Sequence, residues 1–138
     1  MKYRLMLLLS VMVFFFVGCA ASLIGQKVPV NKLTMLSPHD RTFTFEGSND
    51  VVIFRQEDDR LVGKLSFGKL GYVGNQIERL TLVAWFTDSS GVILAKSSYS
   101  WKSREFNMDV DLDFIINMPE GYSKFVYVAF SYHGTYTG

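Results

Sequence analysis

The residues between 109 and 120 carry the pattern that comes closest to a metal site. Five oxygen-bearing side chains fall at positions one, three, five, nine and twelve of a calcium-binding loop: Asp109, Asp111, Asp113, Asn117 and Glu120. Such a loop needs glycine at position six for its sharp turn, and Phe114 stands there. The apolar Val110 and Leu112 instead predict a strand, on which side chains of one face lie about 6.6 Å apart. We therefore expect a solvated strand face, with weak surface binding of Ca²⁺ as the alternative.

Residues 63–70 nearly match a phosphate-binding loop. The motif needs Ser or Thr after its lysine to hold Mg²⁺, and Leu70 occupies that position after Lys69. It also needs a helix directly afterwards, whose N-terminal amides meet the phosphate. The sequence from Gly71 to Gly74 does not begin a helix. We interpret this stretch as a strand with glycines at its edges.

The two histidines, His39 and His133, are far apart in the sequence, and both are expected near turns. His39 and Asp40, close to Ser37, supply the residue types of a hydrolase triad. The sequence lacks the nucleophile-elbow pattern that presents a catalytic serine. A zinc site would need further ligands to converge on the histidines. We therefore predict a protein that is not an enzyme, and we assign no catalytic residue, no metal site and no cofactor.

The charge balance excludes one large class of partner. The chain has 138 residues, which suits a single domain, and a formal net charge of +1. Residues 1–18 contain Lys2 and Arg4 and no acid, so 12 basic residues face 13 acidic ones in the remainder. A nucleic-acid-binding domain normally carries a clustered basic face. We therefore expect no nucleic-acid partner.

The N-terminus has the layout of a targeting segment. Lys2 and Arg4 provide positive charge, and the thirteen residues from Leu5 to Val17 contain only Ser10 as a polar residue. This length and polarity are typical of the hydrophobic region of a secretory signal peptide. Small residues follow the hydrophobic run: Gly18, Cys19, Ala20, Ala21 and Ser22.

The stretch Phe16-Val17-Gly18-Cys19 resembles the lipobox of bacterial lipoproteins, with phenylalanine where leucine is usual. The resemblance implies that the thiol of Cys19 is acylated and that cleavage makes it the first residue of the mature chain. In such lipoproteins an aspartate directly after the cysteine retains the protein in the inner membrane. Ala20 stands at this position, so the resemblance also implies a location in the outer membrane, facing the periplasm. An ordinary cleaved signal peptide and an uncleaved anchor of about 20 residues are the alternatives.

These observations predict a signal peptide over residues 1–18, a lipidated tether over 19–27 and one domain over 28–138. The tether would hold the domain within about 30 Å of the lipid surface, at no more than 3.6 Å per extended residue. Cys19 is the only cysteine, so the domain has no internal disulfide, although an oxidising compartment would permit one.

After residue 27 the sequence alternates between apolar and polar residues, which is typical of strands. Turn residues separate the alternating stretches: 27–36, 42–45, 51–56, 61–70, 80–86, 92–101, 106–114 and 122–133. Seven or eight short strands predict an all-β fold, an antiparallel β-sandwich of immunoglobulin-like or fibronectin-like character. A closed barrel is the alternative.

Two of the expected strands are apolar on both faces. Opposite the core face, Val83 and Trp85 stand on one strand, and Phe125 and Tyr127 stand on the last one. One interpretation is that loops or long side chains cover this outer face. The other is an exposed patch of these four residues that binds an envelope protein partner. The sequence thus predicts a membrane-anchored protein-binding or assembly module, with a small-ligand or glycan-binding lipoprotein as the alternative.

Overall fold

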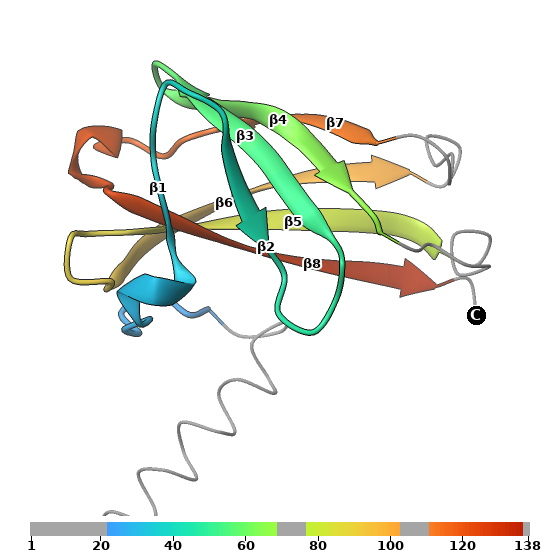
Figure 1. The fold of residues 1–138 in the computed structure, drawn as a ribbon, viewed down its shortest axis with the longest axis horizontal. Coiled ribbons are helices and arrows are strands. Elements are labelled where there is room, and N and C mark those ends of the chain that lie inside the picture. The colour runs from blue at the N-terminus through green and yellow to red at the C-terminus, as the bar shows by residue number, and fades with distance from the viewer. Residues whose placement is uncertain (1–21, 69–76, 103–110, 137–138) are drawn as a thin grey trace, which may run out of the picture.

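The computed structural model describes residues 22–68, 77–102 and 111–136. Within these ranges the chain forms eight strands and two short 3-10 helices (Figure 1). The strands are β1 (Thr34–Met35), β2 (Arg41–Thr44), β3 (Val51–Glu57), β4 (Arg60–Ser66), β5 (Ile77–Thr87), β6 (Ile93–Lys102), β7 (Leu112–Asn117) and β8 (Tyr127–Tyr136). The 3-10 helices are η1 (Val30–Lys32) and η4 (Tyr122–Lys124). None of the helices in these ranges has the length and hydropathy needed to cross a membrane.

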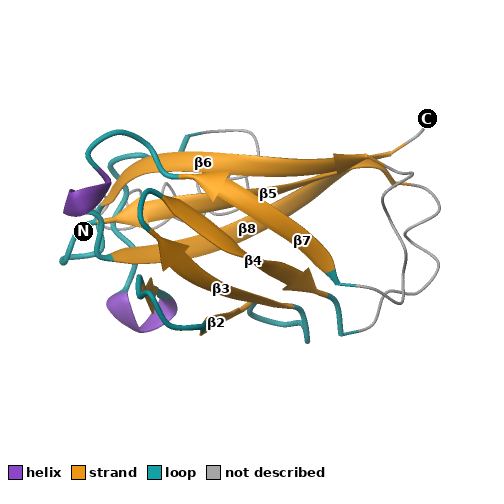
Figure 2. Cartoon of the chain, turned by 90° about the horizontal axis from the view of Figure 1, so that it is seen from above, coloured by secondary structure: helices purple, strands orange, loops and turns teal. Residues whose placement is uncertain are grey.

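The strands form two antiparallel sheets of four strands each. One has the order β1-β8-β5-β6 and the other the order β2-β3-β4-β7. Figure 2 looks down on the strands β2, β3, β4 and β7, with β5, β6 and β8 of the other sheet behind them. The buried core cluster contains residues of both sheets. At one edge the indole nitrogen of Trp101 on β6 donates a hydrogen bond of 2.8 Å to the carbonyl oxygen of Asp113 on β7. The predicted all-β fold of two packed antiparallel sheets is therefore confirmed.

The core is built by the alternation that the sequence shows. Along β7 every residue from Leu112 to Asn117 alternates between buried and exposed. The largest fully buried hydrophobic side chains of the core cluster, within the described ranges, come from both sheets: Val52, Phe54, Leu61, Leu65, Leu82, Phe86, Phe114, Ile116 and Val128. Complete burial of one such side chain contributes about 1.5–3 kcal/mol. A core of this kind can hold the domain without a disulfide.

Two of the predicted turns carry the hairpins. Asp58 adopts a left-handed φ of 56° between β3 and β4. Between β5 and β6, one carboxylate oxygen of Asp88 accepts hydrogen bonds from the Ser90 amide, the Ser90 hydroxyl and the Val92 amide at 3.0, 2.8 and 3.0 Å. Gly91 in the same turn has a φ of 89°, which L residues rarely adopt. These turns set the register of both hairpins.

The largest differences from the predicted strands lie at 27–36 and 122–133. The first range contains η1 and only the two residues of β1, because Pro29 has a φ of −56° and its carbonyl oxygen accepts a hydrogen bond from Lys32. The second begins with η4, and β8 starts only at Tyr127. The predicted strand residues 106–110 lie outside the described ranges.

Candidate functional site

The N-terminal segment, residues 22–28, is docked on the domain. The Gly25 amide donates to the Ile93 carbonyl oxygen at 2.8 Å, and the Ile93 amide donates to the Gln26 carbonyl oxygen at 2.8 Å. The Val28 amide donates to the Gly91 carbonyl oxygen at 2.9 Å. These bonds add a short antiparallel pairing to the beginning of β6. Part of the tether predicted over residues 19–27 is therefore bound to the domain, from Leu23 onwards.

The docked segment covers the outer face of the β1-β8-β5-β6 sheet. Val83, Trp85 and Ile93 are buried there, and Leu23 and Val28 of the N-terminal segment pack against them. We call these five residues the outer cluster. Only 5% of Trp85 is exposed. Val83 and Trp85 are thus covered by the chain's own N-terminal segment.

Polar contacts fix the indole of Trp85 within this cluster. Its Nε1 donates a hydrogen bond of 2.9 Å to the hydroxyl of Ser131 on β8. The ammonium of Lys96 on β6 lies 5.4 Å from the centre of the ring, within the range of a cation–π contact. A buried tryptophan normally finds a partner for its N–H, and Ser131 provides it.

The structure brings together three of the four residues predicted to form the patch. Trp85 pairs with Ala129 and Thr87 with Tyr127 along β5 and β8, so Trp85 and Tyr127 share the outer face with Val83. Phe125 lies on the opposite side, where its ring stacks on Phe86 at 5.0 Å and 19°. Helix η4 ends directly before Phe125, so the alternation of β8 does not extend back to it.

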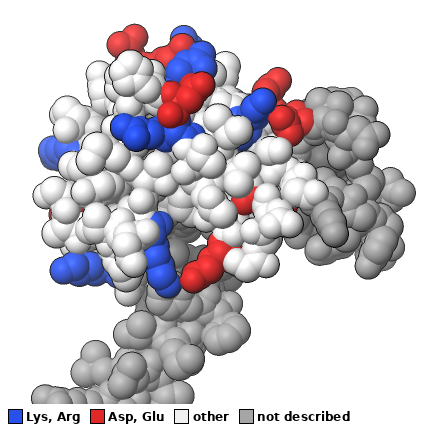
Figure 3. Space-filling model, viewed as in Figure 1, with Lys and Arg blue, Asp and Glu red and all other residues white. Residues whose placement is uncertain are grey.

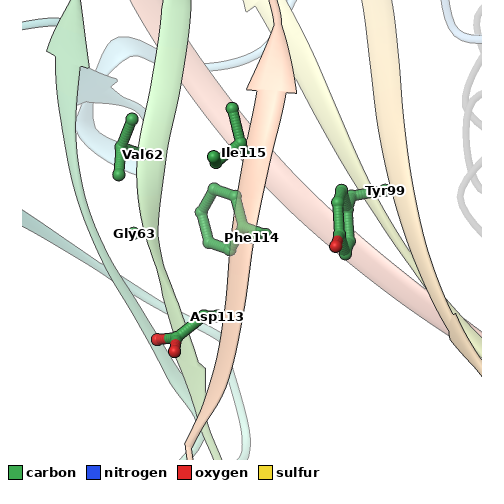
Figure 4. A pocket seen from close by; sticks show the side chains of 6 residues that line it. All are labelled: Val62, Gly63, Tyr99, Asp113, Phe114 and Ile115. Atoms are coloured by element: carbon green, nitrogen blue, oxygen red, sulfur yellow. The ribbon is translucent and has the colours of Figure 1, made fainter. Parts of the chain in front are cut away.

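A pocket of about 310 Å³ opens at the other sheet, and the sequence did not single it out. Six residues from β4, β6 and β7 line it: Val62, Gly63, Tyr99, Asp113, Phe114 and Ile115 (Figure 4). Val62 and Ile115 are register partners on the outer face, and Gly63 pairs with Phe114 without a side chain of its own. Ile115 is 50% exposed. In the alternation of this strand, Ile115 falls on the same face as Asp113 and Asn117. This position is the sequence signal for an apolar residue on a solvated face.

The side chains around this pocket include both charges. On the outer face Lys64 pairs with Asp111 at 3.3 Å, and Arg55 contacts Asp40 and Glu57 at 3.7 and 3.3 Å. Figure 3 shows basic and acidic side chains interspersed above a broad uncharged area. A surface of mixed sign produces no strong field of one sign.

The residues of the other motifs have structural surroundings. Asp111 is paired with Lys64, Asp113 is exposed on β7, and Asp109 lies outside the described residues. His39 donates its amide to the Ser37 hydroxyl at 3.1 Å, and His133 stands opposite Thr81 on β5. Within the described ranges no group of three or more His, Cys, Asp or Glu side chains is arranged to hold a metal ion.

Cys19, the predicted lipid attachment site, lies outside the described residues, three positions before Ser22. No protein-family model, curated protein or solved structure matches the chain.

Proposed function

We propose that this chain is a bacterial lipoprotein anchored through Cys19 to the cell envelope, in the outer membrane facing the periplasm. The observation that carries the proposal is the position of the single cysteine, which follows Gly18 directly after the thirteen-residue hydrophobic run from Leu5 to Val17. The docking of the chain from Leu23 onwards supports it, because the folded part begins close behind the attachment site. The signal peptide would end at residue 18.

The sandwich acts as a non-enzymatic module that binds or assembles an envelope protein. The supporting observation is Ile115, which is half exposed beside the pocket on the outer face of β4 and β7. The N-terminal segment is docked on the other sheet. An anchored domain would therefore keep the face around Ile115 free for a partner. Partly exposed apolar side chains within a polar rim are typical of protein interfaces.

The two packed antiparallel sheets are the one feature that supports an immunoglobulin-like character. Immunoglobulin constant domains have the strand orders ABED and CFG, in which the first strand pairs with the second. Here β1 pairs with the last strand, β8, and β8 lies between β1 and β5. The domain thus shares the layered architecture and has its own strand order.

The lipid anchor is tested by metabolic labelling with an acyl probe in a bacterial host. The wild-type chain should incorporate the label, and Cys19→Ser should lose it and remain unprocessed. Labelling of Cys19→Ser at the wild-type level would remove the lipoprotein proposal.

The partner is tested by affinity capture from solubilised envelopes of the native organism. Ile115→Asp should lose a protein that the wild type captures. Thr44→Asp, an exposed change on β2 at the far edge of the same sheet, should keep it. Equal capture by wild type and Ile115→Asp would place the binding surface elsewhere.

A small-ligand or glycan-binding lipoprotein is the second candidate. The pocket offers the ring of Tyr99 and the carboxylate of Asp113, a pair that suits stacking on a sugar and hydrogen bonding to its hydroxyls. Glycan-array binding that disappears in Tyr99→Ala, together with the absence of a captured protein, would favour this function.

A further inference from the structure

We propose that the domain rests directly on the lipid surface, on the side where its N-terminal segment is docked. The inference rests on the proposed lipidation of Cys19 and adds to it a fixed orientation. The exposed apolar residues of this side enter the headgroup layer, and its lysines contact anionic lipid phosphates.

The first argument is the length of free chain. Only Ala20 and Ala21 separate Cys19 from Ser22, and the hydrogen bonds of the N-terminal segment to β6 begin at Gly25. An extended chain covers at most about 3.6 Å per residue, so Ser22 lies within about 11 Å of Cys19. A lipidated Cys19 would therefore hold the docked segment against the headgroups, which leaves no room for a protein between them.

The second argument is the distribution of exposed apolar side chains. Among the described residues, large exposed hydrophobic residues lie mainly on this side: Ile24, Val30, Met35 and Leu94 are 50, 42, 50 and 38% exposed. Ile24 and Leu94 are near each other, because the Gly25 amide is hydrogen bonded to the carbonyl oxygen of Ile93. Met35 pairs with Tyr127 at the edge of the same sheet. Apolar side chains of surface-bound segments enter the headgroup and acyl boundary.

The third argument is the charge of this side. Residues 22–36 contain Lys27 and Lys32 and no acid, and Lys96 is exposed near the beginning of β6. Lys32 forms an ion pair of 3.6 Å with Glu46, so the positive charge for lipid phosphates comes from Lys27 and Lys96. Lys27 is exposed and forms an isolated bridge with Val92 directly before β6. Basic side chains next to a membrane are attracted by anionic lipids. Apolar and basic residues are thus combined where the anchor enters the domain.

The experiment uses the full lipidated chain in vesicles of phosphatidylethanolamine and phosphatidylglycerol. Because Cys19 is the only cysteine, an introduced cysteine is the single reactive thiol once Cys19 is acylated. Ile24→Cys and Leu94→Cys receive an environment-sensitive fluorophore, and a lipid-bound nitroxide serves as the quencher. Thr42→Cys, exposed on β2 of the opposite sheet, is the matched control.

We expect quenching at positions 24 and 94 to exceed that at position 42 at least about threefold. Lys27→Glu combined with Lys96→Glu should lower quenching at position 24 by roughly twofold, as should vesicles of phosphatidylcholine alone. Equal quenching at positions 24 and 42, or none at position 24, would overturn the inference. So would crosslinking of Ile24→Cys to a second copy of the chain.

Acyl labelling of the same samples separates this failure from a failure of the proposed anchor. A chain that carries the acyl label and shows no preferred face contradicts the orientation alone. A chain without the label contradicts the lipoprotein proposal itself.

Discussion

Trp85 and Ser131 are joined across β5 and β8 by a hydrogen bond of 2.9 Å from the indole nitrogen to the hydroxyl. The ring of this tryptophan is also covered by Leu23 and Val28 of the N-terminal segment. The N–H of the indole therefore has its hydrogen-bond partner, and the apolar faces of the ring are covered, both by residues of the same chain. Trp85 holds the N-terminal segment to the sheet, which leaves the face around Ile115 as the candidate surface for a partner.

Replacing Trp85 should destabilise the domain. Trp85→Ala would leave a cavity in the outer cluster, and truncation of a buried tryptophan costs about 3–5 kcal/mol of the free energy of unfolding. Urea denaturation measures the loss. Trp85→Phe is the control, because it keeps most of the apolar contact and loses the hydrogen bond to Ser131. An unfolding free energy of Trp85→Ala equal to that of the wild type would contradict the burial of this residue.

The turn at Asp88 should respond to acid. Hydrogen bonds from the Ser90 side chain and the Val92 amide, partly opposed by desolvation, lower the pKa of the Asp88 carboxyl. A carboxyl whose pKa is lower in the folded state contributes stability above its unfolded pKa of about 4. This contribution is lost as the pH falls through the lower, folded pKa.

An NMR titration of the Asp88 carboxyl carbon measures this effect. Ser90→Ala removes the largest cause of the shift, so the pKa of Asp88 should rise towards its usual value. A pKa of Asp88 that does not change in Ser90→Ala would disprove the role of the hydroxyl.

Calcium should leave the thermal midpoint unchanged. Asp111 is paired with Lys64, and Asp113 projects from a strand in which Phe114 is buried. Binding at 100 times the dissociation constant would add about 2.7 kcal/mol of stability. A differential scanning measurement with and without millimolar Ca²⁺ tests this expectation. A rise of the midpoint that is absent in Asp111→Asn would revive the calcium site.

The layered fold could be predicted from the sequence because alternation and turn residues are local signals. The alternation of Leu112, Phe114 and Ile116 marked β7, and Asp88 to Gly91 marked the hairpin between β5 and β6. The same local signals predict one strand over residues 27–36. Pro29, which caps the 3-10 helix η1, interrupts this strand.

The sequence could not decide whether Trp85 was exposed. Alternation showed only that Val83 and Trp85 lie opposite the core, and the cover comes from Leu23 and Val28, about sixty residues earlier in the chain. The pocket was missed for a related reason. Its lining combines Tyr99 of β6 with residues of β4 and β7, and no local pattern encodes which strands of the two sheets lie side by side.

The docking of the N-terminal segment can be tested at Gly91. A Cβ at this position would collide with the carbonyl oxygen of Val28, and the backbone has a φ of 89°. Gly91→Ala should therefore both strain the turn and push the N-terminal segment away from β6. We expect a loss of unfolding free energy larger than the roughly 1–2 kcal/mol of a left-handed L residue. Limited digestion with trypsin should also cleave faster after Lys27.

Gly47→Ala provides the matched control for this prediction. Gly47 has a similar φ of 81°, yet an added Cβ would meet nothing within 4 Å. Gly47→Ala should lose only the unfolding free energy that a left-handed L residue costs. Trypsin should cleave it after Lys27 as slowly as it cleaves the wild type. If both variants lost the same stability and were cleaved after Lys27 at the wild-type rate, the contact of Val28 with Gly91 would not hold the segment in place. Faster cleavage in Gly91→Ala alone would instead tie the position of the N-terminal segment to this turn, because exposure of a tryptic site follows local release of the backbone.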